Sequence, residues 1–192
     1  MWTLLPLGNP GADYAHTRHN LGRLMVLRWM EDHSIAPRVL RKLPSGTIYG
    51  LNDRLQALVP ATYMNLSGLA CAEGVKAGLD PSRFVLLYDD KDLPLGTGRF
   101  RLEGSHGGHN GVHSVQEALA TAALPRLRLG IGPFGRPLAD FVLGEWTESE
   151  WERLKALDAP FARFLDLLAE TDDATVLPNQ VNGDAFWAAD QP

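Results

Sequence analysis

The sequence predicts a single-domain α/β protein: a twisted, mixed and mostly parallel β-sheet flanked by helices. Strand-like segments alternate with segments of helical spacing, which favours parallel pairing of the strands. Between residues 38 and 59, three short strand-like segments follow one another without a helix, so that part of the sheet is expected to be antiparallel. A chain of 192 residues, 45% of them hydrophobic, fits one domain over residues 1–192 better than two.

The first half of the chain divides into strands and helices by hydrophobic periodicity. We predict strands at 2–7, 38–43, 46–51 and 54–59, and helices from Thr17 to about Asp32 and at 66–78. Pro6 indicates an edge strand or a strand end, because proline cannot donate to a ladder. Gly68 and Gly74 weaken the second helix.

The second half begins with a near-continuous apolar run, residues 83–88, which predicts a buried strand that ends before Asp89. We further predict strands at 98–103 and 124–131, helices at 110–122 and 147–170, and a glycine-proline loop at 130–137. Thr147 or Glu148 is expected to cap the long last helix. The remaining tail is polar, with Phe186 and Trp187 available to dock on the core.

Composition limits the classes of protein. The single cysteine, Cys71, excludes an internal disulfide and a cysteine-based zinc finger. Neither a signal peptide nor a run of about 20 apolar residues is evident, so a cytoplasmic location is expected. The net charge is −5, but residues 140–192 hold 12 acidic and 3 basic residues, whereas residues 1–139 hold 11 acidic and 15 basic ones. The larger part of the chain can therefore still bind phosphate locally.

The stretch 104–114 concentrates glycine and histidine, with four glycines and three histidines. Glycine lets a backbone approach a ligand closely, and histidine can carry a proton, bind a metal or hydrogen-bond a substrate. We expect this loop to open a helix with Asn110 near its N-cap. In α/β sheets, sites form at the carboxyl ends of strands. Asn9, Asp89 and the glycine-histidine loop each follow a predicted strand, so we expect them to converge.

These polar groups permit general-base chemistry. His19 lies in a dense polar run before the first helix, and an imidazole is an effective base when a carboxylate fixes its tautomer. Asp89 is the best candidate partner, although a surface histidine and a turn aspartate would give the same pattern. Asn9, Asn65 and Asn110 stand at turns or helix starts, where asparagine is common, and could also hold a carbonyl and stabilise an oxyanion.

Other chemistries fit less well. A metal site is conceivable, because zinc accepts histidine and aspartate and the chain offers His106, His109, His113, Asp89, Asp90 and Asp92. The glycines between the histidines indicate a loop rather than one helical face, and no H-E-x-x-H is present. A serine hydrolase lacks its G-x-S-x-G motif. Five arginines could contact phosphate or simply lie exposed on strand faces: Arg99, Arg101, Arg126, Arg128 and Arg136.

Several segments together resemble bacterial peptidyl-tRNA hydrolase. The matching stretches are Leu7–Gly11 with Tyr14 and Thr17–Asn20, Val59–Pro60 with Tyr63–Gly68, Asp89 with Asp92–Pro94, Gly104–Gly111, and Arg126–Gly132 with Phe141–Gly144. They occur in the order and spacing of that family. Three features depart from it: Pro6 stands where a small glycine is usual, the chain is more acidic, and similarity is thin after residue 145.

The resemblance implies a monomeric enzyme, without metal or cofactor, that cleaves the ester between a stalled peptide and the tRNA 3′ end. His19 then corresponds to the base that activates water, and Asp89 to its orienting carboxylate. Substrate-binding positions are matched by Asn9, Tyr14, Met64, Asn65, His109 and Asn110, and the positions that clamp the tRNA 5′ phosphate by Arg101 and Arg128. Two alternatives stay open, a non-catalytic RNA-binding relative of the same fold and a metal-dependent amidase.

Overall fold

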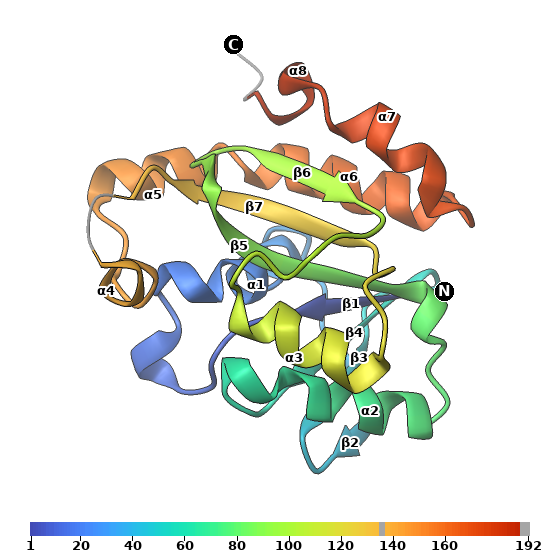
Figure 1. Cartoon of the computed structure of the whole chain (residues 1–192). Coiled ribbons are helices and arrows are strands. Elements are labelled where there is room, and N and C mark those ends of the chain that lie inside the picture. The colour runs from blue at the N-terminus through green and yellow to red at the C-terminus, as the bar shows by residue number, and fades with distance from the viewer. Residues whose placement is uncertain (135–136, 189–192) are drawn as a thin grey trace.

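The computed structural model describes residues 1–134 and 137–188, and Arg136 lies outside these ranges. Its strands are β1 (Trp2–Pro6), β2 (Arg38–Leu43), β3 (Gly46–Gly50), β4 (Leu55–Pro60), β5 (Phe84–Pro94), β6 (Gly98–Arg101) and β7 (Arg126–Gly132). They form one sheet in the order β2-β3-β4-β1-β5-β7-β6 (Figure 1). The central pairs β4–β1, β1–β5 and β5–β7 are parallel, and the flanking pairs are antiparallel. The predicted mixed α/β sheet is confirmed.

Helices cover both faces of the sheet (Figure 1). The helices of four or more residues are α1 (Leu21–Asp32), α2 (Ser67–Lys76), α3 (Asn110–Leu119), α4 (Leu138–Val142), α5 (Glu148–Lys155), α6 (Asp158–Glu170), α7 (Leu177–Val181) and α8 (Asp184–Trp187). Alternate residues of the buried strands point to opposite faces, so Val85 and Leu87 pack with α1 and α6, whereas Leu86 and Tyr88 pack with α2 and α3. Two hydrophobic layers therefore hold the strand ends in fixed positions.

Proline 6 ends a central strand. β1 lies between β4 and β5, so the edge-strand alternative is wrong and the strand-end alternative is confirmed. The ladder continues past Pro6 through the backbone N–H of Leu7, which donates to the carbonyl of Leu87 at 3.0 Å. The proline thus costs the sheet little, and the chain leaves the strand directly at Gly8 and Asn9.

Several predicted boundaries are wrong. The first helix begins at Leu21 rather than Thr17, after a 3₁₀ turn at Arg18–Asn20, and β7 continues to Gly132, into the predicted loop. The two largest errors concern β5 and the last predicted helix. β5 does not stop before Asp89 but continues to Pro94, with an irregularity in its pairing to β7 between Asp90 and Pro94. This extension needs Gly130, because a Cβ there would lie 2.0 Å from the carbonyl oxygen of Pro94. The predicted helix 147–170 is two helices, α5 and α6, since Pro160 in an uninterrupted helix would clash with the carbonyl of Ala156. Thr147 does cap α5, with a capping box to Glu150.

The polar tail forms α7 and α8, and Trp187 is buried against Phe164 at a ring-centroid separation of 6.5 Å. Its predicted docking is confirmed. In the described part of the chain, no helix combines the length and the apolar character that a membrane crossing requires.

Gly22 sets how closely α1 approaches the sheet. A Cβ at this position would lie 2.1 Å from the carbonyl oxygen of Leu87 and 2.6 Å from its carbon. Because both atoms belong to the backbone of a central strand, neither can move aside cheaply. We expect Gly22→Ala to lower the free energy of unfolding by about 3 kcal/mol and the Tm by about 6–12 °C, measured by thermal and urea denaturation.

Gly183→Ala is the control for that substitution, since a Cβ at Gly183 would meet nothing within 4 Å. It adds the same methyl group before a helix, where alanine is a poorer N-cap than glycine, so we expect less than about 1 kcal/mol. Equal losses of stability in the two variants would contradict the close approach of α1 to β5.

Candidate active site

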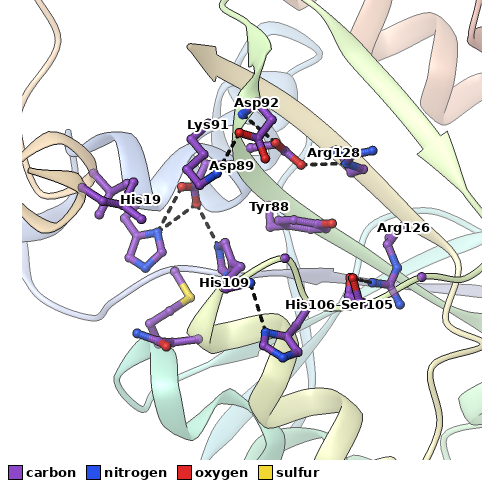
Figure 2. A pocket seen from close by; sticks show the side chains of 18 of the residues that line it. His19, Tyr88, Asp89, Lys91, Asp92, Ser105, His106, His109, Arg126 and Arg128 are labelled. Atoms are coloured by element: carbon purple, nitrogen blue, oxygen red, sulfur yellow. Dashed lines mark hydrogen bonds and ion pairs between the residues drawn. The ribbon is translucent and has the colours of Figure 1, made fainter. Parts of the chain in front are cut away.

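A cleft of about 920 Å³ opens at the carboxyl ends of the central strands (Figure 2). It is lined by Asn9, His19, Met64, Asn65, Tyr88–Asp92, Arg101, residues 103–110, Arg126, Arg128, Leu138, Ala139, Val142 and Leu143. The three polar clusters expected to converge all contribute to it: Asn9 after β1, Asp89 on β5, and the glycine-histidine loop after β6. Of the sequence-predicted site residues, only Tyr14 is absent from the lining; its ring packs edge-on against Tyr63 at 6.1 Å.

His19 and Asp89 form a hydrogen-bonded pair in this cleft (Figure 2). His19 lies in a 3₁₀ turn, Arg18–Asn20, just before α1, and its Nδ1 is 3.0 and 3.1 Å from the two oxygens of Asp89. The carboxylate can only accept, so the neutral imidazole carries its proton on Nδ1. Nε2 then keeps a free lone pair, and none of the residues the structure describes hydrogen-bonds to it.

His109 is the second partner of Asp89. Its Nδ1 accepts from the backbone N–H groups of Gly111 and Val112, and its Nε2 is 3.1 Å from Oδ1 of Asp89. These two acceptor contacts place the proton of the neutral ring on Nε2, which donates to the carboxylate. His109 is therefore the N-cap of α3, and the expectation that Asn110 stands near the cap is refined by one position: Asn110 is the first helical residue.

The electrostatics follow from burial and from this pairing. Burial raises the pKa of Asp89, but the charges on His19 and His109 and their hydrogen bonds outweigh it, so the pKa lies well below its usual range. Burial lowers the pKa of His19, whereas the charge and hydrogen bond of Asp89 raise it by more, so the pKa lies above the ordinary value of a histidine. The site thus holds a fixed negative charge under an imidazole that binds a proton more readily than a free histidine.

Asn9 is held so that one side of its amide is available. Its Oδ1 accepts from the backbone N–H of Met64 at 2.8 Å, which assigns the amide orientation and leaves Nδ2 as a donor. Asn20 fixes the main chain of Asn9 through two hydrogen bonds of 2.8 and 2.9 Å. Asn65 and Asn110 are exposed on the cleft wall, and Met64 is buried beside Gly111, where a Cβ would lie 2.4 Å from its sulfur.

The structure separates the predicted arginines into different roles. Arg126 is 1% exposed and donates to the carbonyls of Ala122, Leu124 and Ser105, so it fixes the loop rather than lying exposed. Arg99 pairs with Asp184 at 2.7 Å. Arg128 lines the cleft and pairs with Asp90, and Arg101 is exposed there without a partner among the described residues. Of the predicted arginines, Arg101 and Arg128 therefore line the cleft with side chains that are not enclosed by backbone carbonyls.

Sequence reasoning missed two features of the site. The first is the apolar wall that α4 contributes through Leu138, Val142 and neighbouring residues; the i, i+4 spacing of these two could have indicated a helical turn. The second is Arg18, whose Nη2 donates to both oxygens of Glu150 at 2.9 and 2.7 Å and whose guanidinium lies 4.7 Å from the Phe141 ring. Because Glu150 is 132 residues away in the sequence, no local sequence pattern predicts this ion pair.

One cluster in the described part of the chain could hold a metal: His19, Asp89 and His109, whose ligand atoms lie within 4.8 Å of one another. His106 and His113 are not part of it; their rings contact each other at 4.7 Å. Nitrogen and oxygen donors of this kind suit zinc, but in the structure the same atoms hydrogen-bond to one another. The arrangement therefore accommodates proton transfer without further rearrangement.

Taken together, the fold and the cleft define a single-domain α/β protein with a paired histidine and buried aspartate in its cleft, the groups that general-base catalysis requires. The family model described as peptidyl-tRNA hydrolase matches residues 3–187, and the chain belongs to this family. A relative in Chloroflexus aurantiacus named peptidyl-tRNA hydrolase is 40% identical over 191 residues, covering 95% of this chain and 99% of the relative. One in Carboxydothermus hydrogenoformans is 44% identical over 160 residues, covering 81% and 84%.

The fold agrees with solved structures of the same family. The crystal structure of peptidyl-tRNA hydrolase from Acinetobacter baumannii matches with a TM-score of 0.81 at 27% identity, covering 98% of this chain and 95% of that chain. The similarity extends over the C-terminal helices, where the sequence resemblance was thin. Hydrolysis of peptidyl-tRNA, an ester hydrolase activity, is thus the function that the family and fold support.

Proposed function

We propose that this protein cleaves the ester between the peptide and the tRNA in peptidyl-tRNA released from stalled ribosomes, with His19 as the general base. One observation carries the proposal: His19, which lines the cleft, is tied through Nδ1 to the buried carboxylate of Asp89, and its Nε2 has no hydrogen-bond partner among the described residues. We expect the enzyme to act as a cytoplasmic monomer. Positioned base catalysis of this kind contributes about 10²–10⁴ in rate.

In the proposed reaction, His19 takes up one proton and later returns it. Nε2 takes a proton from water as the water oxygen attacks the ester carbonyl, giving a tetrahedral oxyanion. Asp89 stabilises the imidazolium through its hydrogen bond and charge. Collapse of the intermediate breaks the bond to the ribose oxygen, which takes the proton from Nε2. The products are a peptide with a free carboxyl group and a tRNA with a free terminal hydroxyl.

Amide groups and arginines position the two ends of the substrate. Nδ2 of Asn9 is the best-placed donor for the reacting carbonyl, because its Oδ1 is already occupied by the N–H of Met64. Asn65 and Asn110 line the same cleft and can hold the peptide backbone. Arg101 and Arg128 are assigned to the 5′ phosphate of the tRNA, so binding should weaken as salt rises.

The test is turnover of a defined peptidyl-tRNA in the presence of EDTA. We expect unchanged kcat and KM, because Asp89 already uses its charge on two imidazoles rather than on a cation. Loss of activity with EDTA and its recovery with zinc would instead favour a metal-dependent enzyme that uses His19, Asp89 and His109. Binding of the substrate without any turnover would favour a non-catalytic RNA-binding relative.

A further inference from the structure

Asp90 is the carboxylate that holds Arg128. Its Oδ2 accepts from Nε of Arg128 at 2.7 Å, and both side chains are largely removed from solvent, with 11% of Asp90 and 27% of Arg128 exposed. The register of the sheet explains the contact. Tyr88 pairs with Arg128 and Asp90 pairs with Gly130, so Asp90 faces a residue without a side chain and leans along β7 to Arg128.

This contact leaves one edge of the guanidinium free. A guanidinium has five N–H donors, and Asp90 uses the one on Nε. Within the described residues, the structure gives Nη1 and Nη2 no hydrogen-bond partner. These two nitrogens form the planar fork that binds two oxygens of one phosphate at once. Arg128 lines the cleft, so its fork remains available there to an anion (Figure 2).

Asp90 is itself fixed from the other side. Its Oδ1 accepts from the backbone N–H of Asp92 at 2.9 Å, so each carboxylate oxygen has a separate partner. The neighbouring carboxylate of Asp92 is different, because it is exposed and, among the residues that the structure describes, forms an ion pair only with Lys91, at 2.7 Å. Asp90 and Asp92 therefore lie close together on one strand and carry the same charge, but only Asp90 bonds to Arg128.

We propose that Asp90 is a positioning residue that orients the Arg128 fork for the 5′ phosphate of the tRNA. The proposal rests on the proposed function, which assigns that phosphate to Arg101 and Arg128. Arg101 has no such support, so the bidentate, geometry-sensitive contact belongs to Arg128 and the looser charge attraction to Arg101. Discrimination for a 5′-phosphorylated substrate then depends on a residue that does not itself touch the phosphate.

The proposal predicts an effect opposite in sign to simple electrostatics. Removing a negative charge beside a phosphate site strengthens attraction of the phosphate, which would lower KM. If Arg128 is no longer oriented, its side chain must be ordered at each binding event, which costs free energy and raises KM. Asp90→Asn separates the two effects. Its remaining oxygen can still accept from the N–H of Asp92, while the new NH₂ group cannot accept from Nε of Arg128.

The experiment measures kcat and KM on the same peptidyl-tRNA with and without its 5′ phosphate, and compares the ratio of the two KM values. In the wild type, we expect the phosphorylated substrate to have the lower KM. Asp90→Asn should raise its KM about tenfold and bring the ratio near one, with kcat and the KM of the dephosphorylated substrate unchanged. Asp92→Asn, the matched control, should keep the ratio or increase it.

The Arg128 variants separate this inference from the proposed function. Arg128→Ala should bring the ratio of the two KM values near one. Adding Asp90→Asn to Arg128→Ala should then leave the ratio unchanged. A wild-type ratio in Arg128→Ala would overturn the phosphate assignment and the inference together. If the ratio of KM values is near one in Arg128→Ala but as in the wild type in Asp90→Asn, the inference alone is overturned. A fall in kcat in Asp90→Asn would also overturn the inference alone.

If Asp90→Asn does not fold, Arg128→Lys decides the question. It keeps the positive charge but lacks the Nε that Asp90 holds and the fork that Asp90 orients. We expect the ratio of the two KM values to be as close to one in Arg128→Lys as in Arg128→Ala. A wild-type ratio in Arg128→Lys would overturn the proposal.

Discussion

His19→Ala is expected to lower kcat for peptidyl-tRNA cleavage by about 10²–10⁴-fold while leaving KM nearly unchanged. The imidazole is the group that the proposed mechanism asks to take a proton from water, and its Nε2 has no other partner among the described residues. The nearby His109 cannot replace the base, because the lone pair on its Nδ1 accepts from the N–H groups of Gly111 and Val112 and its Nε2 donates to Asp89. Single-turnover kinetics on a defined peptidyl-tRNA measure the loss.

His33→Ala is the control for this substitution. His33 is exposed at the opposite end of α1, where its ring bonds to the carbonyl of Trp29, and it should leave kcat unchanged. Circular dichroism and binding of deacylated tRNA should be unchanged in both variants. Wild-type turnover in His19→Ala would refute the assignment of the base.

Asp89→Asn is expected to reduce kcat/KM by about 10²–10⁴ and to move its pH dependence. In the wild type, burial lowers the pKa of His19 but Asp89 raises it by more, so the net pKa is above 6.5. Activity requires the neutral imidazole and should therefore fall as the pH drops through that raised value. In the variant only burial remains, so the pKa of His19 decreases and the acidic limb of the profile shifts to lower pH.

The shift of the acidic limb distinguishes an orienting carboxylate from a structural one. Asp92→Asn is the control, since it removes an exposed charge from the same strand without touching His19. It should keep both the plateau and the acidic limb. An acidic limb in Asp89→Asn at the wild-type pH or above would show that Asp89 does not act through the pKa of His19.

The central strands could be predicted from the sequence because burial on both faces leaves a strong pattern. The run from Phe84 to Tyr88 is apolar without interruption, and the structure places every one of its side chains in a core. The same reasoning brought Asn9, Asp89 and the glycine-histidine loop to one edge of the sheet. Strand direction explains this convergence for Asn9 and Asp89, because β1 and β5 are parallel. It does not explain it for the loop, because β6 is antiparallel to β7 and the loop runs back across the sheet before His109 meets Asp89.

Side-chain partners could not be predicted in the same way. Arg126 looks like an exposed strand residue, yet three carbonyls of the loop and the α3–β7 connection surround it. The pair of Arg18 with Glu150 joins segments 132 residues apart. The break between α5 and α6 was foreseeable, because Pro160 is visible in the sequence, but the amphipathic spacing on either side of it favoured one continuous helix.

In the glycine-histidine loop, the residue types indicate the backbone conformation but not the hydrogen bonds of the side chains. Glycine at 107 and 108 suits the positive φ angles of 58° and 81° that the backbone adopts there. The sequence could not show that His109 itself caps the helix and thereby fixes its own tautomer. That detail depends on which ring nitrogen meets the N–H groups of Gly111 and Val112.

The protonation of the His19 ring can be measured directly by ¹⁵N NMR of the imidazoles across a pH titration of the wild-type protein. We expect neutral His19 to carry its proton on Nδ1, with Nε2 unprotonated, and its pKa to lie above 6.5 and to coincide with the acidic limb of kcat/KM. A neutral ring protonated on Nε2, or a pKa of His19 at or below 6.5, would contradict this expectation.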